Sequence, residues 1–253
     1  PAGMQAAIVL AERGFRPILF ERRAYLGGSA VLASKAPCKG LVAEYIETQK
    51  NQLAALGVQV ELNHAPTMAE LRRLDPYGIF VTMGGQQIVP DIPGIDRENV
   101  FGIEDILLGR RVIEGRKVAV IGGGHVGLEV AHFLCANNKV TIVEMADEIG
   151  ASVYYITKFK LLPLLREAGV TFRTGQAIAA VDDGSIRLRD THTGQCTELK
   201  AEAVVLAMGS RPDLAARAAF DRNFDHVVYA GDAVRGGTML EANRDAFALA
   251  WEF

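Results

Sequence analysis

Three glycines with the spacing G-x-G-x-x-G follow an apolar run near the middle of the chain. Gly122, Gly124 and Gly127 come directly after Val118-Ala-Val-Ile121. Such a run typically forms a buried strand that turns sharply into a helix, whose free backbone N–H groups can hold a pyrophosphate. A second apolar segment ends on Glu144, 22 residues after Gly122, where a carboxylate can meet an adenosine ribose. This order predicts a dinucleotide site; the alternative is a glycine-rich turn without a ligand.

The charges that follow Glu144 bear on which nicotinamide cofactor would bind. Asp147 and Glu148 add two negative charges, and no Lys or Arg directly follows the strand. An NADPH site usually places a cation there to pair with the 2′-phosphate. The sequence therefore predicts NADH. The alternatives are an indifferent, solvated loop, or a cation, Lys158 or Lys160, that reaches in from the next helix.

Two other groups of residues allow chemistry of a different kind. His125, Glu129 and His132 share one face of the predicted helix at i, i+4 and i+7, an arrangement that can hold a metal. Because His125 lies in the phosphate turn, we expect no metal site here. Cys38 could be a redox thiol, but no second cysteine lies near it in the sequence, so an ordinary cysteine is expected.

Strand and helix patterns alternate along the whole chain, which predicts an α/β fold. The turn dipeptides Asp183-Gly184 and Thr193-Gly194 separate three short strands and predict a β-meander. Pro163 is expected to break or start its helix, and the stretch after Pro212 to be irregular. The expected helices span residues 2–13, 41–56, 68–74, 126–136 and 156–168, with a last helix from residue 240. The expected strands span 16–20, 58–62, 78–82, 118–121, 140–144, 177–181, 185–189, 195–199, 203–207 and 226–230, with a linker at 84–94.

The order of elements occurs twice, which indicates an internal duplication. Thr82-Met83-Gly84 in the first half corresponds to Ala207-Met208-Gly209 in the second. The first half lacks its opening strand and the first part of its glycine turn. The start at Pro1-Ala-Gly-Met4 is not a natural one, so we expect a piece of a longer protein. The fold predicted is two doubly wound, Rossmann-like dinucleotide-binding domains, the second inserted in the first.

Bulk properties narrow the class of protein. The net charge of −3 and the pI near 6.0 give no electrostatic reason to expect nucleic acid or an anionic membrane. No apolar run approaches the length of a membrane span, so no membrane partner is expected. Three scattered cysteines cannot build a disulfide scaffold, and a cytoplasmic location follows by default. The sequence leaves open whether copies of the chain form a homo-oligomer.

Further motifs, in a fixed order, carry a family resemblance. They are Pro1-Ala-Gly-Met4, Leu19-Phe-Glu21, Leu26-Gly-Gly28, Val89-Pro-Asp-Ile-Pro-Gly94, Ala230-Gly-Asp-Ala-Val234 and Gly237-Thr-Met-Leu-Glu-Ala242. With these, essentially the whole chain resembles the flavoproteins that have two dinucleotide-binding domains. Within them it is most similar to the C-terminal half of old-yellow-enzyme-like reductases, the group of 2,4-dienoyl-CoA reductase and 2-enoate reductase.

The resemblance implies two cofactor sites. Residues around FAD would be Gly3, Glu21, Arg22, Gly27, Gly28, Gly84, Gly231 and Asp232. Residues around NAD would be Gly122, Gly124, His125, Val126, Gly127, Glu129, Glu144 and Gly209, with Glu129 near the nicotinamide. Residues 1–103 and 213–253 would form the FAD-binding domain and residues 104–212 the inserted NAD-binding domain. For Glu21 the alternative is a surface acid at a strand end, and for Asp232 a cap of the following turn.

The activity implied is transfer of hydride from NADH to FAD and onward to a flavin and iron–sulfur barrel domain outside this chain. The expected partners are therefore NADH and the remainder of the same polypeptide. The alternative is a structural or regulatory module that holds ADP, as understood for amine dehydrogenases of the wider group. Catalytic residues stay unknown, and the chain lacks the C-x-x-x-x-C of the disulfide-reducing branch. Without the first FAD glycines, this chain alone is expected to bind FAD poorly and to be inactive.

Overall fold

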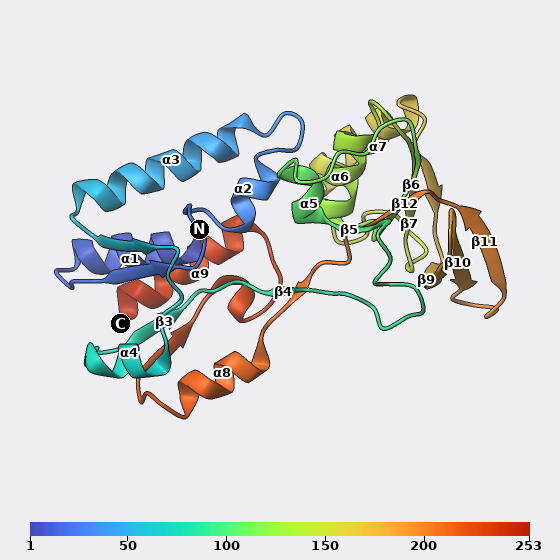
Figure 1. Cartoon of the computed structure of the whole chain (residues 1–253). Helices are drawn as coiled ribbons and strands as arrows, with labels where there is room; N and C mark the ends of the chain where they lie inside the picture. The colour runs from blue at the N-terminus through green and yellow to red at the C-terminus, as the bar shows by residue number, and fades with distance from the viewer. The chain divides into compact units, whose positions relative to one another are not determined.

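A computed structural model describes all residues from 1 to 253 and has the α/β fold expected (Figure 1). The chain divides into two compact units. The first contains residues 1–34, 40–86 and 210–253, and the second contains residues 35–39 and 87–209. The assignment of residues 1–103, 104–212 and 213–253 to cofactor-binding domains remains a prediction.

The first unit is built around α1 (Ala2–Glu12), a helix buried on most of its sides. Such burial suits its sequence, which is apolar all round rather than along one stripe. Ala6 packs toward α9 (Met239–Glu252) and contributes to one core cluster, and Ile8 packs toward α3 (Gly40–Ala55) in another. The unit's other elements are β1 (Ile18–Glu21), α2 (Ser29–Ala33), β2 (Gln59–Leu62), α4 (Met68–Arg73), β3 (Ile79–Val81), α8 (Leu214–Asp221), β14 (Val227–Tyr229) and a 3-10 turn (Gly231–Ala233). Strand β1 pairs with β2, and β3 with β14, both in parallel.

The second unit holds a five-stranded parallel sheet in the order β5 (Val100–Gly102), β12 (Ala203–Leu206), β6 (Lys117–Ile121), β7 (Lys139–Val143) and β8 (Thr171–Arg173). All four residues of β12 are buried, as expected for a strand covered on both faces. The helices of this unit are α5 (Ile103–Leu107), α6 (His125–Leu134) and α7 (Tyr155–Glu167). No helix in the chain combines the length and the apolar composition that crossing a membrane requires.

The predicted β-meander is present as β9 (Gln176–Val181), β10 (Ser185–Asp190) and β11 (Cys196–Lys200), paired antiparallel with β10 in the middle. From Ile186 onward the side chains of β10 alternate, so Ile186 and Leu188 are buried while Arg187 and Arg189 on the other face are exposed. Ile186 and Leu188 lie on the buried face and pack in one core cluster with Ala119 and Val204 of the parallel sheet. The meander is therefore part of the second unit's core.

Several elements correct the sequence expectations. The stretch after Pro212 is not irregular: α8 forms there, and the Asp213 carboxylate caps it by accepting from the Ala216 N–H at 2.9 Å. Pro163 neither breaks nor starts its helix but lies inside α7 at an exposed position, where water can satisfy the carbonyl that loses its partner. The expected linker contains β4 (Gln86–Gln87), which pairs with β13 (Ser210–Arg211). Helices α2 and α5 and strands β5 and β8, each five residues or fewer, were too short to show a periodicity.

Removing buried volume from the meander should destabilise the second unit. Ile186 is 0% exposed, so Ile186→Ala should lower the free energy of unfolding by about 2–5 kcal/mol. Arg189→Ala lies on the exposed face of the same strand and should change it by less than about 0.5 kcal/mol. Urea unfolding followed by fluorescence and circular dichroism measures both. Equal small effects would show that the meander does not pack as described.

Candidate functional site

The glycine turn joins β6 to α6 through two close backbone contacts. Gly122 has φ of +110°, and a Cβ there would overlap the carbonyl of Ala207 at the end of β12. A Cβ on Gly127 would overlap the carbonyl oxygen of Gly122 itself. These two positions therefore require glycine, one for a left-handed turn beside a neighbouring strand and the other for close packing of helix on strand.

Gly124 differs from these two, because the space around it is open. It is the N-cap of α6, no side chain caps the helix there, and nothing lies within 4 Å of the position of a Cβ. His125 and Val126 follow as the first residues of the helix. The backbone at the start of α6 is thus accessible to an anion, as pyrophosphate binding requires.

Glu144 lies beside this turn, at the carboxyl end of β7. One carboxylate oxygen, Oε2, accepts from the Gly123 N–H at 2.6 Å, and the other, Oε1, accepts from the Ala146 N–H at 2.8 Å. The acid is therefore fixed by the turn and by its own loop, with lone pairs left for further donors. The sequence placed Glu144 correctly next to the turn but did not show that it also stabilises the turn.

The loop after Glu144 has a defined backbone frame. Gly175 N–H donates to the Ala146 carbonyl at 2.9 Å, and Gln176 N–H donates to the Glu144 carbonyl at 3.0 Å. Gly175, at φ +62°, makes the left-handed bend that allows both bonds. The frame thus ties the end of β7 to the chain that follows β8.

The same frame occurs in the first unit around Glu21, at the end of β1. Its Oε1 accepts from the Arg23 N–H at 2.8 Å. Asn63 N–H donates to the Arg23 carbonyl and His64 N–H to the Glu21 carbonyl, both at 2.9 Å. Asn63, at φ +54°, takes the place of Gly175, because Asn tolerates the left-handed region better than other residues with a side chain. In these two loops the predicted internal duplication therefore extends to the individual hydrogen bonds.

Gly209 completes the edge at which several of the residues predicted to bind NAD gather. It follows β12, which pairs with β6, and β6 pairs with β7. The carboxyl ends of three neighbouring strands thus present Gly209, the glycine turn and Glu144 at one edge of the sheet. In doubly wound folds, ligands bind outside this edge.

Glu129 lies on the second turn of α6 and is 7% exposed, so its charge needs partners. Lys39 Nζ lies 2.6 Å and His125 Nε2 2.8 Å from the same oxygen, Oε1. Burial disfavours the charged carboxylate, but the hydrogen bonds from His125 and Lys39 outweigh it and hold the pKa of Glu129 below its ordinary value. Lys39 was not predicted, because nothing in the sequence connects it to a residue 90 positions away.

The metal arrangement considered for His125, Glu129 and His132 is not assembled. Glu129 contacts Lys39 and His125, and no group of three His, Cys, Asp or Glu side chains in the chain is placed to hold a metal ion. Cys38 is an exposed free thiol, in the segment that precedes Lys39.

Several of the residues predicted to bind FAD gather around the start of α1 in the first unit. A Cβ on Gly28 would lie 3.7 Å from Pro1, and a Cβ on Gly231 would lie 3.2 Å from Ala2. The carboxylates of Glu21 and Asp232 lie close enough to Pro1 to act electrostatically on its nitrogen. Glu21, Gly28, Gly231 and Asp232 therefore surround the same helix end.

Asp232 also has local partners. Its two oxygens accept from the Ser210 hydroxyl and the Gly237 N–H, each at 3.2 Å. The bond to Gly237 is the turn cap that was the alternative for this residue, so the acid has at least this structural role.

The other residues assigned to FAD differ in their surroundings. A Cβ on Gly3 or Gly27 would meet packed side chains, so these glycines permit close packing. Arg22 is exposed, and the position of a Cβ on Gly84 is open.

Comparison with known proteins shows the family to which this chain belongs. Residues 1–226 match the family described as "Pyridine nucleotide-disulphide oxidoreductase", and the chain belongs to this family. Its members are FAD- and NAD(P)-binding flavoproteins, so the predicted cofactors, FAD and NAD, are those of the family.

The similar proteins are longer oxidoreductases. The whole chain is 32% identical to an NADH oxidase of Thermoanaerobacter brockii and covers 39% of it. A bilirubin reductase of Mediterraneibacter gnavus is 30% identical over 91% of the chain, which covers 36% of that protein. The structure of a 2-naphthoyl-CoA reductase matches the whole chain with a TM-score of 0.90 at 27% identity, and the chain covers 38% of it. The predicted resemblance to NADH-dependent, enoate-reductase-like flavoproteins is thus confirmed.

Gly124 and Gly127 should respond very differently to the same added methyl group. Gly127→Ala would place its methyl group on the Gly122 carbonyl oxygen, so α6 must move, and we expect a loss of more than about 3 kcal/mol in unfolding free energy. Gly124→Ala meets open space and should cost less than about 1 kcal/mol. Urea unfolding of the two variants tests this. Similar costs at both positions would contradict the described approach of helix and strand.

The partners of Glu129 should make stability depend on pH. Because its folded pKa lies below the ordinary 4.5, its contribution is complete above pH 4.5 and is lost as the pH falls through the folded value. Glu129→Gln should therefore cost about 1–3 kcal/mol of unfolding free energy near pH 7 and progressively less below about pH 4. Glu167→Gln, an exposed acid on α7, is the control. A cost for Glu129→Gln that stays constant from pH 7 to pH 3 would show that its ion pairs contribute nothing.

Proposed function

We propose that this chain is the nucleotide-binding portion of an NADH-dependent flavoprotein oxidoreductase. Within the full-length protein it binds NADH on the second unit and contributes to FAD binding on the first, and electrons pass from NADH to FAD. The flavin supplies the redox chemistry, while the protein binds and orients both cofactors. The proposal assigns NAD to Gly122, Gly124, Gly127, Glu144 and Gly209 and their neighbours, and FAD to the residues around the start of α1.

One observation carries the proposal: an open helix N-terminus and a fixed carboxylate share one edge of a parallel sheet. The uncapped start of α6 suits a pyrophosphate, and Glu144 is within hydrogen-bond distance of the turn that leads into it. A carboxylate at this distance from the pyrophosphate site suits the ribose hydroxyls of the adenosine half. Membership of a flavoprotein family that binds FAD and NAD(P) supports the same assignment.

The final electron acceptor is proposed to lie in another part of the polypeptide. The chain spans about two fifths of the length of the relatives it matches, which include an NADH oxidase and two reductases. A barrel domain with a flavin and an iron–sulfur cluster would receive the electrons, so this chain by itself would not reduce substrate. The location of the whole protein is proposed to be cytoplasmic.

The second candidate function is a module that holds a nucleotide without redox turnover. The same geometry supports it, because the start of α6 and Glu144 would contact only the ADP half of a dinucleotide. Flavin reduction separates the two. Under anaerobic conditions NADH should bleach the flavin absorption of the full-length protein, and Gly124→Ala should weaken the response, since its methyl group occupies the open space beside the pyrophosphate. Tight ADP binding with no bleaching would favour the module.

The preference for NADH over NADPH should depend on Glu144. A 2′-phosphate would lie against its carboxylate, with Asp147 and Glu148 close in sequence. Lys158, one cation considered as an alternative, is already ion-paired with Glu148. We expect the rate constant of flavin reduction divided by the dissociation constant to favour NADH at least tenfold, which corresponds to about 1.4 kcal/mol. Glu144→Ala should reduce the preference to within about threefold.

A control variant separates the effect of Glu144 from that of Arg173, a cation on the neighbouring strand. The carbonyl of Arg173 accepts from the Glu144 N–H at 2.8 Å, and the Arg173 side chain is exposed. Arg173→Gln should leave the preference for NADH in place, because the acid remains. Equal or better use of NADPH by the wild-type protein would refute the role of Glu144.

A further inference from the structure

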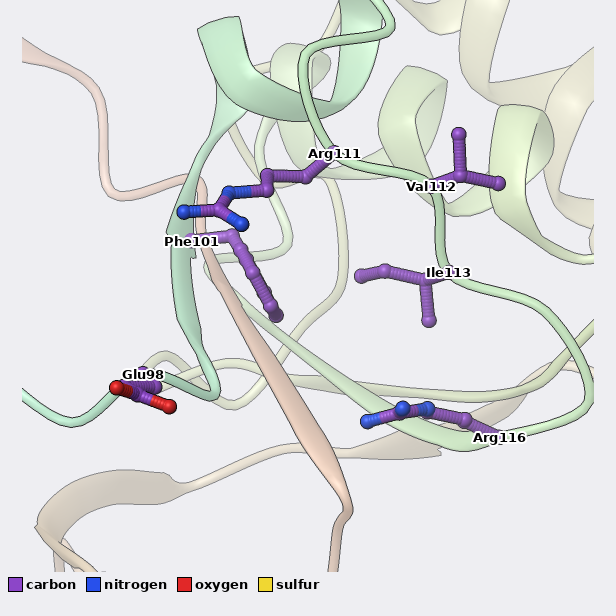
Figure 2. Close-up of a pocket in the computed structure, with 6 residues that line it drawn as sticks. All are labelled: Glu98, Phe101, Arg111, Val112, Ile113 and Arg116. Carbon is purple, nitrogen blue, oxygen red and sulfur yellow. The ribbon is translucent and has the colours of Figure 1, made fainter.

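A cavity of about 410 Å³ in the second unit lies beside the edge strand β5 (Figure 2). We name it the β5 cavity. Its walls come from the approach to β5 and from the segment between α5 and β6. The lining residues are Glu98, Phe101, Arg111, Val112, Ile113 and Arg116. The volume lies within the range of small-molecule sites in proteins.

Two arginines give this cavity its charge. Arg111 and Arg116 are both exposed, and neither guanidinium group has a hydrogen-bond or ion-pair partner in the structure. Their neighbour Arg110 differs, because it pairs with Glu104 at 3.4 Å. Glu98 is the one acid in the lining, so the lining carries a net charge of +1. An arginine fork without a partner is a ready donor to a carboxylate.

The rest of the lining is apolar. Figure 2 shows the Phe101 ring and the Ile113 side chain directed into the space between β5 and the segment that precedes β6. Ile113 is 6% exposed and therefore forms a fixed wall, whereas Val112 is 77% exposed and leaves apolar surface in contact with water. A ligand with an apolar body would cover this surface, which is favourable in proportion to the area removed from water.

The β5 cavity is separate from the glycine turn. Arg116 comes directly before β6, and Gly122 directly follows it. The five residues of β6 span about 16 Å at the rise of a strand. A molecule held by Arg116 therefore lies toward the opposite end of this strand from a pyrophosphate at the start of α6.

We infer that the β5 cavity binds a small monocarboxylate with an apolar, aryl or acyl body. The two guanidinium groups reach the cavity from opposite sides of the space between Phe101 and Ile113 (Figure 2), so the carboxylate lies against one of them while the body lies against Phe101, Ile113 and Val112. The single positive net charge of the lining matches a monoanion, while Glu98 repels a second negative charge. This site is independent of the proposed dinucleotide function.

The experiment uses 4-fluorobenzoate as the probe, with binding to the purified protein followed by fluorine NMR line broadening. The wild-type protein should bind it saturably at one site, and the neutral 4-fluorobenzamide much more weakly. Arg111→Gln and Arg116→Gln should each weaken binding by up to about fivefold, the range for exposed charge pairs. Glu98→Gln should strengthen it by a similar factor. Arg189→Gln, which removes an exposed cation from the meander, should leave it unchanged.

Four results would overturn the inference. They are broadening that does not saturate, equal binding of 4-fluorobenzamide, displacement of the probe by NADH, and binding of inorganic phosphate with the same affinity. Broadening that does not saturate would show that there is no defined site, and equal binding of 4-fluorobenzamide would show that the arginines do not recognise the carboxylate. Displacement by NADH would place the probe at the glycine turn instead, and equal binding of phosphate would show that the apolar wall contributes nothing.

Discussion

The close approach of α6 to the end of β6 is the constraint on which the second unit depends. The helix begins where Gly127 lies against the carbonyl of Gly122, and Gly122 in turn lies against the end of β12. The start of α6 and the ends of β6 and β12 are therefore in direct backbone contact, and no flexible side chain lies between them that could adjust to a change in their positions. This contact determines where the free N–H groups of the helix point, and hence where a pyrophosphate could bind. The buried positions of the parallel sheet require only apolar side chains, whereas positions 122 and 127 require glycine.

The charged groups at the start of α6 include one buried carboxylate, that of Glu129. Glu129 keeps its charge because Lys39 and His125 both donate to one of its oxygens. Such a group is costly if either partner is lost, which makes it weak as a source of stability and useful as a means of fixing position. The segment that carries Lys39 belongs to the second compact unit although the residues on both sides of it belong to the first.

The sequence was sufficient to predict those elements that have a periodic pattern of apolar residues or a recognisable motif. The glycine spacing, the buried strands and the meander turns were sufficient for the fold and for the edge at which Gly122, Glu144 and Gly209 meet. Sequence reasoning missed α2, α5, β5 and β8, whose few residues show no period of their own. It also failed for Pro163, because the cost of a proline depends on whether water reaches the freed carbonyl. Lys39 could not be found, since an ion pair between distant residues leaves no local signal.

The hydrogen bonds of Glu144 and Glu21 have a consequence for the thermodynamics of ligand binding. Glu144 accepts from two backbone N–H groups and Glu21 from one, so the rotamer of each acid is restricted by the fold itself. A glutamate that is free in solution loses side-chain entropy when a ligand immobilises it, and that loss opposes association. Here the loss occurs when the chain folds, and it would not recur on binding of the ribose that we propose as the ligand. The entropy lost in ordering these two acids is therefore part of the free energy of folding. It does not reduce the binding free energy that hydrogen bonds to a ligand would supply.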